Sequence, residues 1–208
     1  MKPTRMVVIG AGGIGSCLVH YLAKMLEYGA PGSALVIIDG DEFEQKNRSR
    51  QLFLSMGNKA ASLAAELAPQ YDKTFIIPIP KWVVEEVKEG DSGEDKVVAS
   101  DFLQEGDVIF PVVDNFMARK VVFDAAAKLD NVDVISAGND DALFVSMYHY
   151  QRRDGKDVTM HPRLIHPEYE NPPDRNPGEL SCQERAAIDG GTQLVAANVA
   201  AAALILGK

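Results

Sequence analysis

A glycine-rich turn near the N-terminus constrains the fold of this chain more than any other feature. Residues 10–15 read GAGGIG and join an apolar, β-branched run, Met6–Ile9, to a segment with helically spaced leucines, Ser16–Tyr28. Glycines allow a tight strand-to-helix turn and a close approach of backbone to phosphate, and the helix N-terminus adds free N–H groups. The pattern in this context predicts a nucleotide phosphate site, with a tight turn that binds nothing as the alternative.

The rest of the chain alternates strand-like and helix-like segments. The pattern predicts five parallel strands at Met6–Ile9, Leu35–Asp39, Thr74–Ile79, Val108–Val113 and Val132–Ala137. Helices are expected at Ser16–Tyr28, Lys59–Leu67, Phe116–Leu129 (N-capped by Asn115) and Val195–Leu206. The polar alternation of Leu143–Tyr150 favours an antiparallel edge strand. This order predicts an α/β fold: a doubly wound, mostly parallel Rossmann-like sheet with flanking helices, which binds ligands at the carboxyl ends of its strands.

Two stretches show no regular pattern. Glu89–Lys96 is acidic and is expected to be a solvated loop. Gln151–Leu180 contains five prolines and is longer than ordinary connections, which favours a functional loop. We therefore predict a single nucleotide-binding domain over residues 1–208, with residues 151–181 as a long Pro-rich crossover loop.

Composition argues against a nucleic-acid-binding protein, a zinc protein and a membrane protein. The formal net charge of −9 and the pI of about 4.9 argue against nucleic acid as a partner. The two cysteines form no C-x-x-C pair, so no zinc site is expected, and their low number fits a reducing cytosol. The longest apolar stretch, near Val195–Leu206, is too short to span a bilayer. We therefore expect a cytoplasmic protein.

An acidic residue and a polar segment follow the second predicted strand. Asp39 ends that strand, where a carboxylate typically binds ribose hydroxyls, so NAD and ATP both remain possible. The segment from Asp39 to Gln51 (DGDEFEQKNRSRQ) is dense in charged and amide side chains. A dehydrogenase has no need for these groups, whereas a triphosphate needs cations to neutralise it.

Four motifs, in order along the chain, resemble the ThiF/MoeB/HesA family of ubiquitin-activating-enzyme-like adenylyltransferases. The family signature D-x-D-x-[VF]-x-x-x-N-x-x-R-Q is met at Asp39, Asp41, Phe43, Asn47, Arg50 and Gln51. The double glycine at residues 12–13, the GNKA sequence at residues 57–60 and the D-N-x-x-x-R pattern from Asp114 to Arg119 also fit the family. The spacing before Lys59 is several residues shorter than in the family.

The resemblance implies Mg-ATP as cofactor and a role for each matched residue. It assigns ATP binding to Gly10, Gly12, Gly13, Gly15, Asp39, Asp41, Asn47, Arg50, Gln51, Lys59 and Asn115. It assigns catalysis to Arg50, Lys59, Asp114 and Cys182, with Asp114 also holding Mg²⁺. Cations placed there would stabilise the charge that develops when a carboxylate attacks the α-phosphorus. The plain alternatives are surface ion pairs for Arg50 or Arg119, a solvated Lys59, and turn or helix caps for Asp41 and Asp114.

Cys182 follows the Pro-rich loop, where some family members form a thioester or persulfide with the activated carrier. A thiolate near Arg185 and a helix start would have a lowered pKa, and the alternative is a small packing residue. Cys17 is expected to pack in the core. His161 and His166 make a poor zinc site.

The implied activity is adenylation of the C-terminal carboxylate of a small ubiquitin-like or sulfur-carrier protein with a Gly-Gly tail, by a homodimer or heterodimer. The alternatives are a non-catalytic adaptor subunit, adenylation of another carboxylate or of tRNA, and, last, an NAD-dependent dehydrogenase. The sequence contains no C-x-x-C pair of the kind found in many relatives, and the motifs do not specify the carrier, the pathway or the oligomer.

Overall fold

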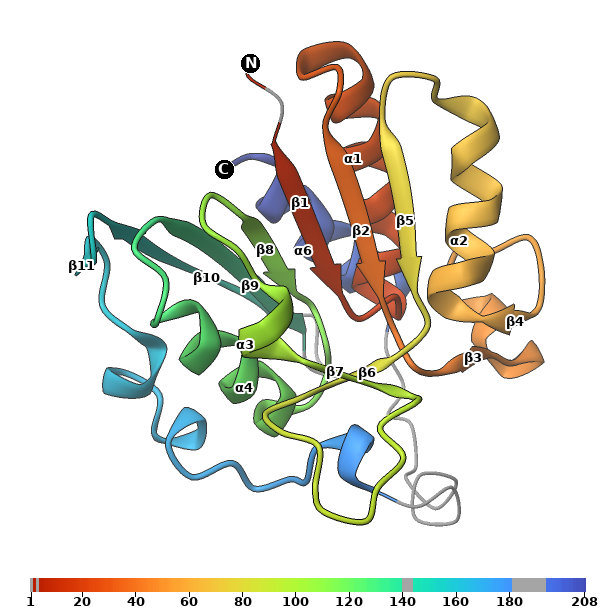
Figure 1. The fold of residues 1–208 in the computed structure, drawn as a ribbon. Coiled ribbons are helices and arrows are strands. Elements are labelled where there is room, and N and C mark those ends of the chain that lie inside the picture. Colours follow the sequence, from red (N-terminus) through yellow and green to blue (C-terminus); the bar gives the residue numbers. More distant parts are fainter. Residues whose placement is uncertain (1, 3, 140–143, 181–193) are drawn as a thin grey trace.

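The computed structural model describes residues 2, 4–139, 144–180 and 194–208, and these form a three-layered α/β domain (Figure 1). The central sheet has seven strands in the order β11-β10-β9-β8-β1-β2-β5. Its bounds are β1 Arg5–Ile9, β2 Ala34–Ile38, β5 Phe75–Ile79, β8 Val108–Pro111, β9 Val132–Asn139, β10 Val145–Arg153 and β11 Lys156–Asp157. The strands from β9 to β5 are parallel, whereas β9, β10 and β11 pair antiparallel. The predicted mostly parallel sheet with an antiparallel edge is therefore confirmed.

Helices cover both faces of the sheet. One face carries α1 (Gly13–Gly29), α2 (Lys59–Leu67) and α6 (Val195–Leu206), and the other carries α3 (Ala99–Phe102) and α4 (Phe116–Ala126) (Figure 1). Along β1, Val7 packs in the core on the α4 side and Val8 in the core on the α1 side. Strands buried on both faces read as continuous apolar runs, which is why the sequence showed them without alternation.

The remaining elements are short. In the described part of the chain they comprise two small ladders, β3 Glu42–Phe43 with β4 Gly57–Asn58 and β6 Trp82–Val84 with β7 Lys96–Val98, and five 3₁₀ turns. The turns are η1 Gln45–Ser49, η2 Ala68–Gln70, η3 Pro162–Leu164, η4 Pro167–Tyr169 and η5 Pro177–Glu179. Strands of two or three residues have no measurable periodicity, so the sequence did not predict them.

Several predicted boundaries differ from the structure, and the three largest differences are of three residues each. Helix α1 begins at Gly13 rather than Ser16, so the end of the glycine turn belongs to the helix. Helix α4 ends at Ala126 rather than Leu129, because the chain continues in tighter turns, such as that from Leu129 N–H to the Ala126 carbonyl. Strand β10 continues to Arg153 and β11 follows it, so the irregular part of the Pro-rich region starts later than the prediction of Gln151.

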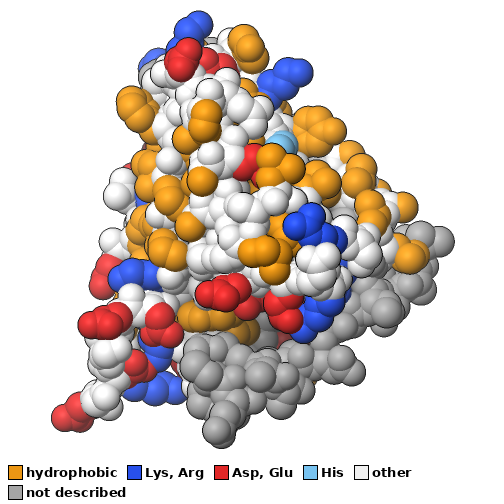
Figure 2. Space-filling view, turned by 90° about the vertical axis from the view of Figure 1, so that its right-hand side faces the viewer, with side chains coloured by type: hydrophobic (Ala, Val, Ile, Leu, Met, Phe, Trp, Pro, Cys, Tyr) orange, Lys and Arg blue, Asp and Glu red, His pale blue; other side chains and the backbone are white. Residues whose placement is uncertain are grey.

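Strand β5 is the exposed edge of the sheet. Phe75 and Ile77 of this strand are 65% and 42% exposed, and the side of the molecule that carries it shows many hydrophobic side chains (Figure 2). Pro78 lies within the strand and has no N–H to donate, which limits pairing with a further strand.

Among the described helices, none is long and apolar enough to cross a membrane.

Candidate active site

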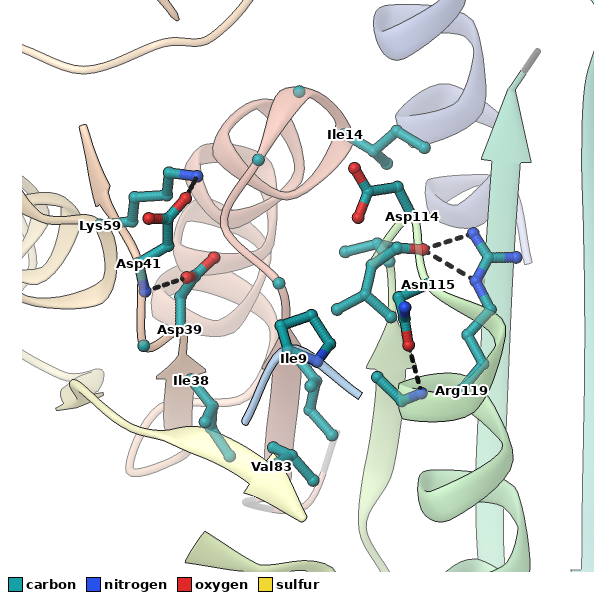
Figure 3. A pocket seen from close by; sticks show the side chains of 18 of the residues that line it. Ile9, Ile14, Ile38, Asp39, Asp41, Lys59, Val83, Asp114, Asn115 and Arg119 are labelled. Atoms are coloured by element: carbon teal, nitrogen blue, oxygen red, sulfur yellow. Dashed lines mark hydrogen bonds and ion pairs between the residues drawn. The ribbon is translucent and has the colours of Figure 1, made fainter. Parts of the chain in front are cut away.

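A pocket of about 600 Å³ opens at the carboxyl ends of β1, β2 and β8. The glycine turn lies in its middle, with Asp39, Asp41 and Lys59 on one side and Asp114 and Asn115 on the other (Figure 3). This is the edge of a doubly wound sheet where ligands bind. The pocket brings together most of the residues predicted to bind ATP; its lining includes Gly10, Gly12, Gly13, Asp39, Asp41, Asn47, Arg50, Gln51, Lys59, Asp114 and Asn115.

The glycines of the turn have different tasks. Gly10 has a φ of +94°, and a Cβ there would lie 2.7 Å from Val113 Cγ1. Gly12 lines the pocket, and a Cβ there would meet nothing closer than Gln51 Nε2 at 3.9 Å, so the backbone at this point is open to a ligand. Gly15 does not line the pocket: a Cβ there would overlap the Gly10 carbonyl. Gly15 was predicted to bind the cofactor, but the structure gives it the task of close packing beneath the turn.

Asp39 directly follows β2 and connects three segments at the floor of the pocket. Its carboxylate accepts the backbone N–H groups of Ala11 at 2.6 Å and Asp41 at 2.8 Å. Its carbonyl accepts the side-chain amide of Asn58 at 2.8 Å. Burial raises the pKa of Asp39, and the Lys59 cation and the two N–H donors oppose that rise. A carboxylate fixed in this way keeps lone pairs that can accept hydroxyl groups of a ligand.

Lys59 is the first residue of α2 and is buried, with its ammonium 2.5 Å from the Asp41 carboxylate. The position follows from local structure: Asn58 caps α2 at Ala61 N–H, and the Lys59 N–H donates to the Asp41 carbonyl at 2.9 Å. Burial works against the ammonium charge, but neighbouring carboxylates outweigh it and raise the pKa of Lys59. Lys59 is therefore a charged group inside the pocket, and the alternative of a solvated helix residue is wrong.

The segment after β3 supplies an amide and a cation. Asn47 is 4% exposed, and its side-chain oxygen accepts the Glu44 N–H at 2.8 Å, which closes a capping box on η1. The N–H groups of Arg50 and Gln51 both donate to the Asn47 carbonyl, so Asn47 holds the backbone of these two pocket residues in place. The Gln51 side-chain oxygen is buried and has no hydrogen-bond partner among the described residues, which suits a ligand or water donor in the pocket.

The turn after β8 presents Asp114 at the exposed rim of the pocket. Within the described chain its carboxylate accepts no hydrogen bond, so Asp114 is not the helix cap that was its plain alternative. Asn115 is the cap, as predicted, because its side chain accepts the Ala118 N–H at 2.8 Å. Arg119 donates to the carbonyls of Val113 and Ala137 and thus holds the turn, which is a structural role rather than a surface ion pair.

Other predicted residues lie away from the pocket. Cys17 is buried in the core, as expected, and burial raises the pKa of its thiol. Cys182 lies outside the described residues. His161 is buried beside Phe123 and Tyr150, and in the described part of the chain no group of three or more His, Cys, Asp or Glu side chains is placed to hold a metal.

Sequence reasoning missed several residues of the pocket wall. Trp82 and Lys81 follow β5, and Asn176 and Pro177 belong to the Pro-rich segment. Trp82 covers Gly40, where a Cβ would lie 2.5 Å from the ring. The position of Lys81 just after a parallel strand is a signal that was available in the sequence, whereas nothing local indicates that residues 176 and 177 return to the pocket.

The donor set fits a magnesium nucleotide. Lys59 and Arg50 bring positive charge, the turn at Gly12 leaves backbone open, and Asp39 offers acceptors on the same side of the turn as Lys59. Asp114 adds a carboxylate at the rim that accepts no hydrogen bond from the described residues, and Mg²⁺ prefers one or two carboxylates together with phosphate oxygens. The pocket can therefore accommodate a polyphosphate, with cations at its phosphates and an acid for its metal.

Comparison with known proteins agrees with this geometry. Solved structures with the same fold include PaaA (TM-score 0.67, 16% identity) and Escherichia coli MccB with AMPCPP and MccA (TM-score 0.62, 20% identity). Each alignment covers 98% of this chain and 54% of the solved chain, so the chain spans about half the length of these proteins. TcdA is a third, with TM-score 0.51 and 16% identity over 66% of this chain and 52% of its own. At these identities the likeness shows the fold alone.

Curated proteins gave no match. The profile of the ThiF family matches residues 1–206, which is nearly the whole chain. Together with the seven-stranded sheet and the pocket at its carboxyl edge, this match means that the chain belongs to the ThiF family.

Proposed function

We propose that this protein binds Mg-ATP in the pocket and adenylates the C-terminal carboxylate of a small protein or peptide. The observation that carries the proposal is the placement of a buried, charged Lys59 and an exposed Asp114 on either side of the glycine turn. The structures of MccB with ATP and with AMPCPP, which share this fold, support a nucleotide as the ligand.

The nucleotide is expected to lie across the glycine turn. Asp39 is at the carboxyl end of β2, where it would accept ribose hydroxyls, and the apolar groups Ile38, Val83 and Trp82 line the adjoining wall for a base. The phosphates would then lie over Gly12 and Gly13, at the N-terminus of α1, whose N–H groups and dipole favour anions. Lys59 and Arg50 would reach these phosphates, and Lys59 would exchange the Asp41 carboxylate for a phosphate oxygen.

The reaction forms one bond and breaks another at the α-phosphorus. A carboxylate oxygen of the substrate attacks, the bond from phosphorus to the bridging oxygen breaks, and the bond electrons leave with pyrophosphate. Lys59 and Arg50 would stabilise the charge that develops on the phosphoryl oxygens and on pyrophosphate. Mg²⁺ held at Asp114 would supply further neutralisation of the phosphates.

The proposed substrate class rests on the family resemblance. We propose a ubiquitin-like or sulfur-carrier protein with a Gly-Gly tail, the substrate class that the family resemblance implies, and we expect the tail to enter beside Asn176 and Pro177, which line the pocket. The Cys182 thiolate would then attack the carbonyl carbon of the acyl adenylate, forming a thioester and releasing AMP, in a protein that acts as a homodimer or heterodimer. A second candidate is a peptide carboxylate, which the structure of MccB with MccA favours.

The test is ATP–pyrophosphate exchange with Mg²⁺ and candidate Gly-Gly-tailed carriers or peptides. We expect exchange that needs the added carboxylate and that falls at least about 100-fold in Asp114→Ala, because a transition-state contact is lost. Asp72→Ala is the matched control, since Asp72 is exposed and does not line the pocket. ATP binding without exchange for any carboxylate would favour the adaptor role, and no ATP binding would refute the proposal. Exchange retained in Cys182→Ala, with loss of a trapped acyl-enzyme, would identify the acceptor.

A further inference from the structure

Residues 174–176 of the Pro-rich region lie across the N-terminus of α4, next to the pocket. The two carboxylate oxygens of Asp174 accept the N–H groups of Phe116 and Met117, each at 2.8 Å. The side chain of Asn115 takes the N–H of Ala118, also at 2.8 Å. The first three free N–H groups of α4 are thus all bound by side chains, two of them by a residue that is 57 or more positions away in sequence.

The contacts on either side of Asp174 fix this segment to two elements. Asn115 donates its side-chain amide to the Arg175 carbonyl at 2.8 Å. Asn176 is 1% exposed, donates to the Val83 carbonyl of β6 at 2.9 Å and accepts the Gly178 N–H at 3.0 Å. The segment therefore connects α4 to β6, and with Asn176 it forms part of the pocket wall.

Asp114 depends on these contacts for its direction. Its carboxylate accepts no hydrogen bond from the described part of the chain, so its orientation follows from the backbone on both sides. Before it, the Val113 carbonyl is held by Arg119 at 2.8 Å and 2.6 Å. After it, Phe116 and Met117 are held by Asp174. Loss of Asp174 would remove the two hydrogen bonds to Phe116 and Met117 and leave only the contacts of Asn115 to support the turn on that side.

We propose that Asp174 is a positioning residue that sets the turn of Asp114 and Asn115 so that the Asp114 carboxylate faces the pocket. Its negative charge also occupies the positive end of the α4 dipole, so the free N–H groups offered to a phosphate are those of α1. The proposal rests on the proposed function in so far as Mg-ATP is the ligand. A helix cap without this role would change stability and leave magnesium dependence as it is.

Trp82 provides the readout, because it is the sole tryptophan of the sequence and lines the pocket. Its fluorescence is titrated with ATP in the presence of Mg²⁺ and in the presence of EDTA, and the ratio of the two affinities measures the magnesium contribution. The variants are Asp114→Ala, Asp174→Ala, Asp174→Asn and the double variant Asp114→Ala with Asp174→Ala. The matched control is Glu105→Ala, because Glu105 likewise accepts two backbone N–H groups, at 2.7 Å each, away from the pocket.

We expect Asp174→Ala to lower the magnesium contribution about tenfold, the effect typical of a residue that orients a metal ligand. The binding of ATP in EDTA should stay within about twofold of the wild type, Asp174→Asn should recover part of the loss, and Glu105→Ala should keep the wild-type ratio. The double variant should lose no more than Asp114→Ala alone, because Asp174 acts through Asp114. A wild-type ratio in Asp174→Ala, or additive losses in the double variant, would overturn the inference.

A second measurement separates this inference from the proposed function. If the wild type binds no ATP, the proposed function fails, and amide hydrogen exchange of the ligand-free protein decides about Asp174. Exchange should accelerate at residues 114–117 in Asp174→Ala and stay unchanged there in Glu105→Ala. Unchanged exchange at residues 114–117 in Asp174→Ala would show that Asp174 does not hold the turn.

Discussion

Substitution of Gly15 by alanine tests whether the close approach of the Gly10 carbonyl requires a glycine at this position. Gly15 is the third residue of α1, and within a helix an alanine is normally about 1 kcal/mol more favourable than a glycine. The added methyl group would overlap the Gly10 carbonyl oxygen and lie 2.9 Å from its carbon. Gly10 has little room to move away, because its φ is +94° and its N–H donates to the Ile38 carbonyl at 2.9 Å.

The magnitude follows from these two opposing effects. Forcing a methyl group into a packed site costs typically 1–3 kcal/mol, and we take about 3 kcal/mol because the obstacle is backbone. Subtracting the gain of about 1 kcal/mol in helix propensity leaves a destabilisation of about 2 kcal/mol. For a chain of 208 residues this corresponds to a fall in Tm of about 4–8 °C.

The assay compares thermal and urea unfolding of Gly15→Ala with that of the wild type and Gly12→Ala. At Gly12 the nearest atom to the new methyl is 3.9 Å away and φ is −77°, so the loss of stability should stay below about 1 kcal/mol. That methyl faces the pocket, however, so Gly12→Ala should weaken ATP binding while the protein remains folded. A Gly15→Ala variant as stable as the wild type, or equal losses in both variants, would show that the Gly10 carbonyl does not exclude a side chain at residue 15.

Two further predictions concern buried titratable side chains. Lys59→Gln should weaken ATP binding about 10- to 100-fold, the worth of one charge-assisted hydrogen bond, and calorimetric titration checks this; an unchanged Kd would remove Lys59 from the site. His161 is 4% exposed and burial lowers its pKa, so the unfolded chain takes up a proton first as the pH falls below about 6.5. Its contribution to stability is therefore complete above that pH and is lost below it. The urea midpoint of unfolding should fall more between pH 7.5 and pH 5.0 in the wild type than in His161→Phe. An equal fall in the two proteins would contradict the prediction.

Some parts of the site could be predicted from the sequence because they depend on local residues. The glycine turn, the polar segment from Asp39 and the Asp114–Asn115 pair each follow a predicted strand directly. Parallel strands bring their carboxyl ends to the same edge, so the strand order was enough to predict that these residues share a pocket. The functions of Asn47 and Asn115 as caps also follow from short-range contacts, and Asn115 was predicted on that basis.

Other parts depend on contacts between distant segments. Gly15 looks like a ligand-binding glycine in sequence, and only the closeness of the Gly10 carbonyl shows that it serves packing. Arg119 belongs to a polar motif, yet its guanidinium donates hydrogen bonds to two backbone carbonyls, those of Val113 and Ala137. The burial of Lys59 results from the β3–β4 ladder, which is too short to leave a pattern.

The α/β order, the edge of the sheet where the pocket opens and most of the residue types that line it follow from the amino-acid sequence. These properties arise from hydrophobic periodicity and from turns between adjacent elements, which local residues control. The tertiary structure alone decided that Asp174 binds the N-terminus of α4, that Asn176 joins the pocket wall and that Trp82 covers Gly40. Such contacts join segments tens of residues apart, so their geometry is fixed by packing of the whole domain rather than by any local pattern.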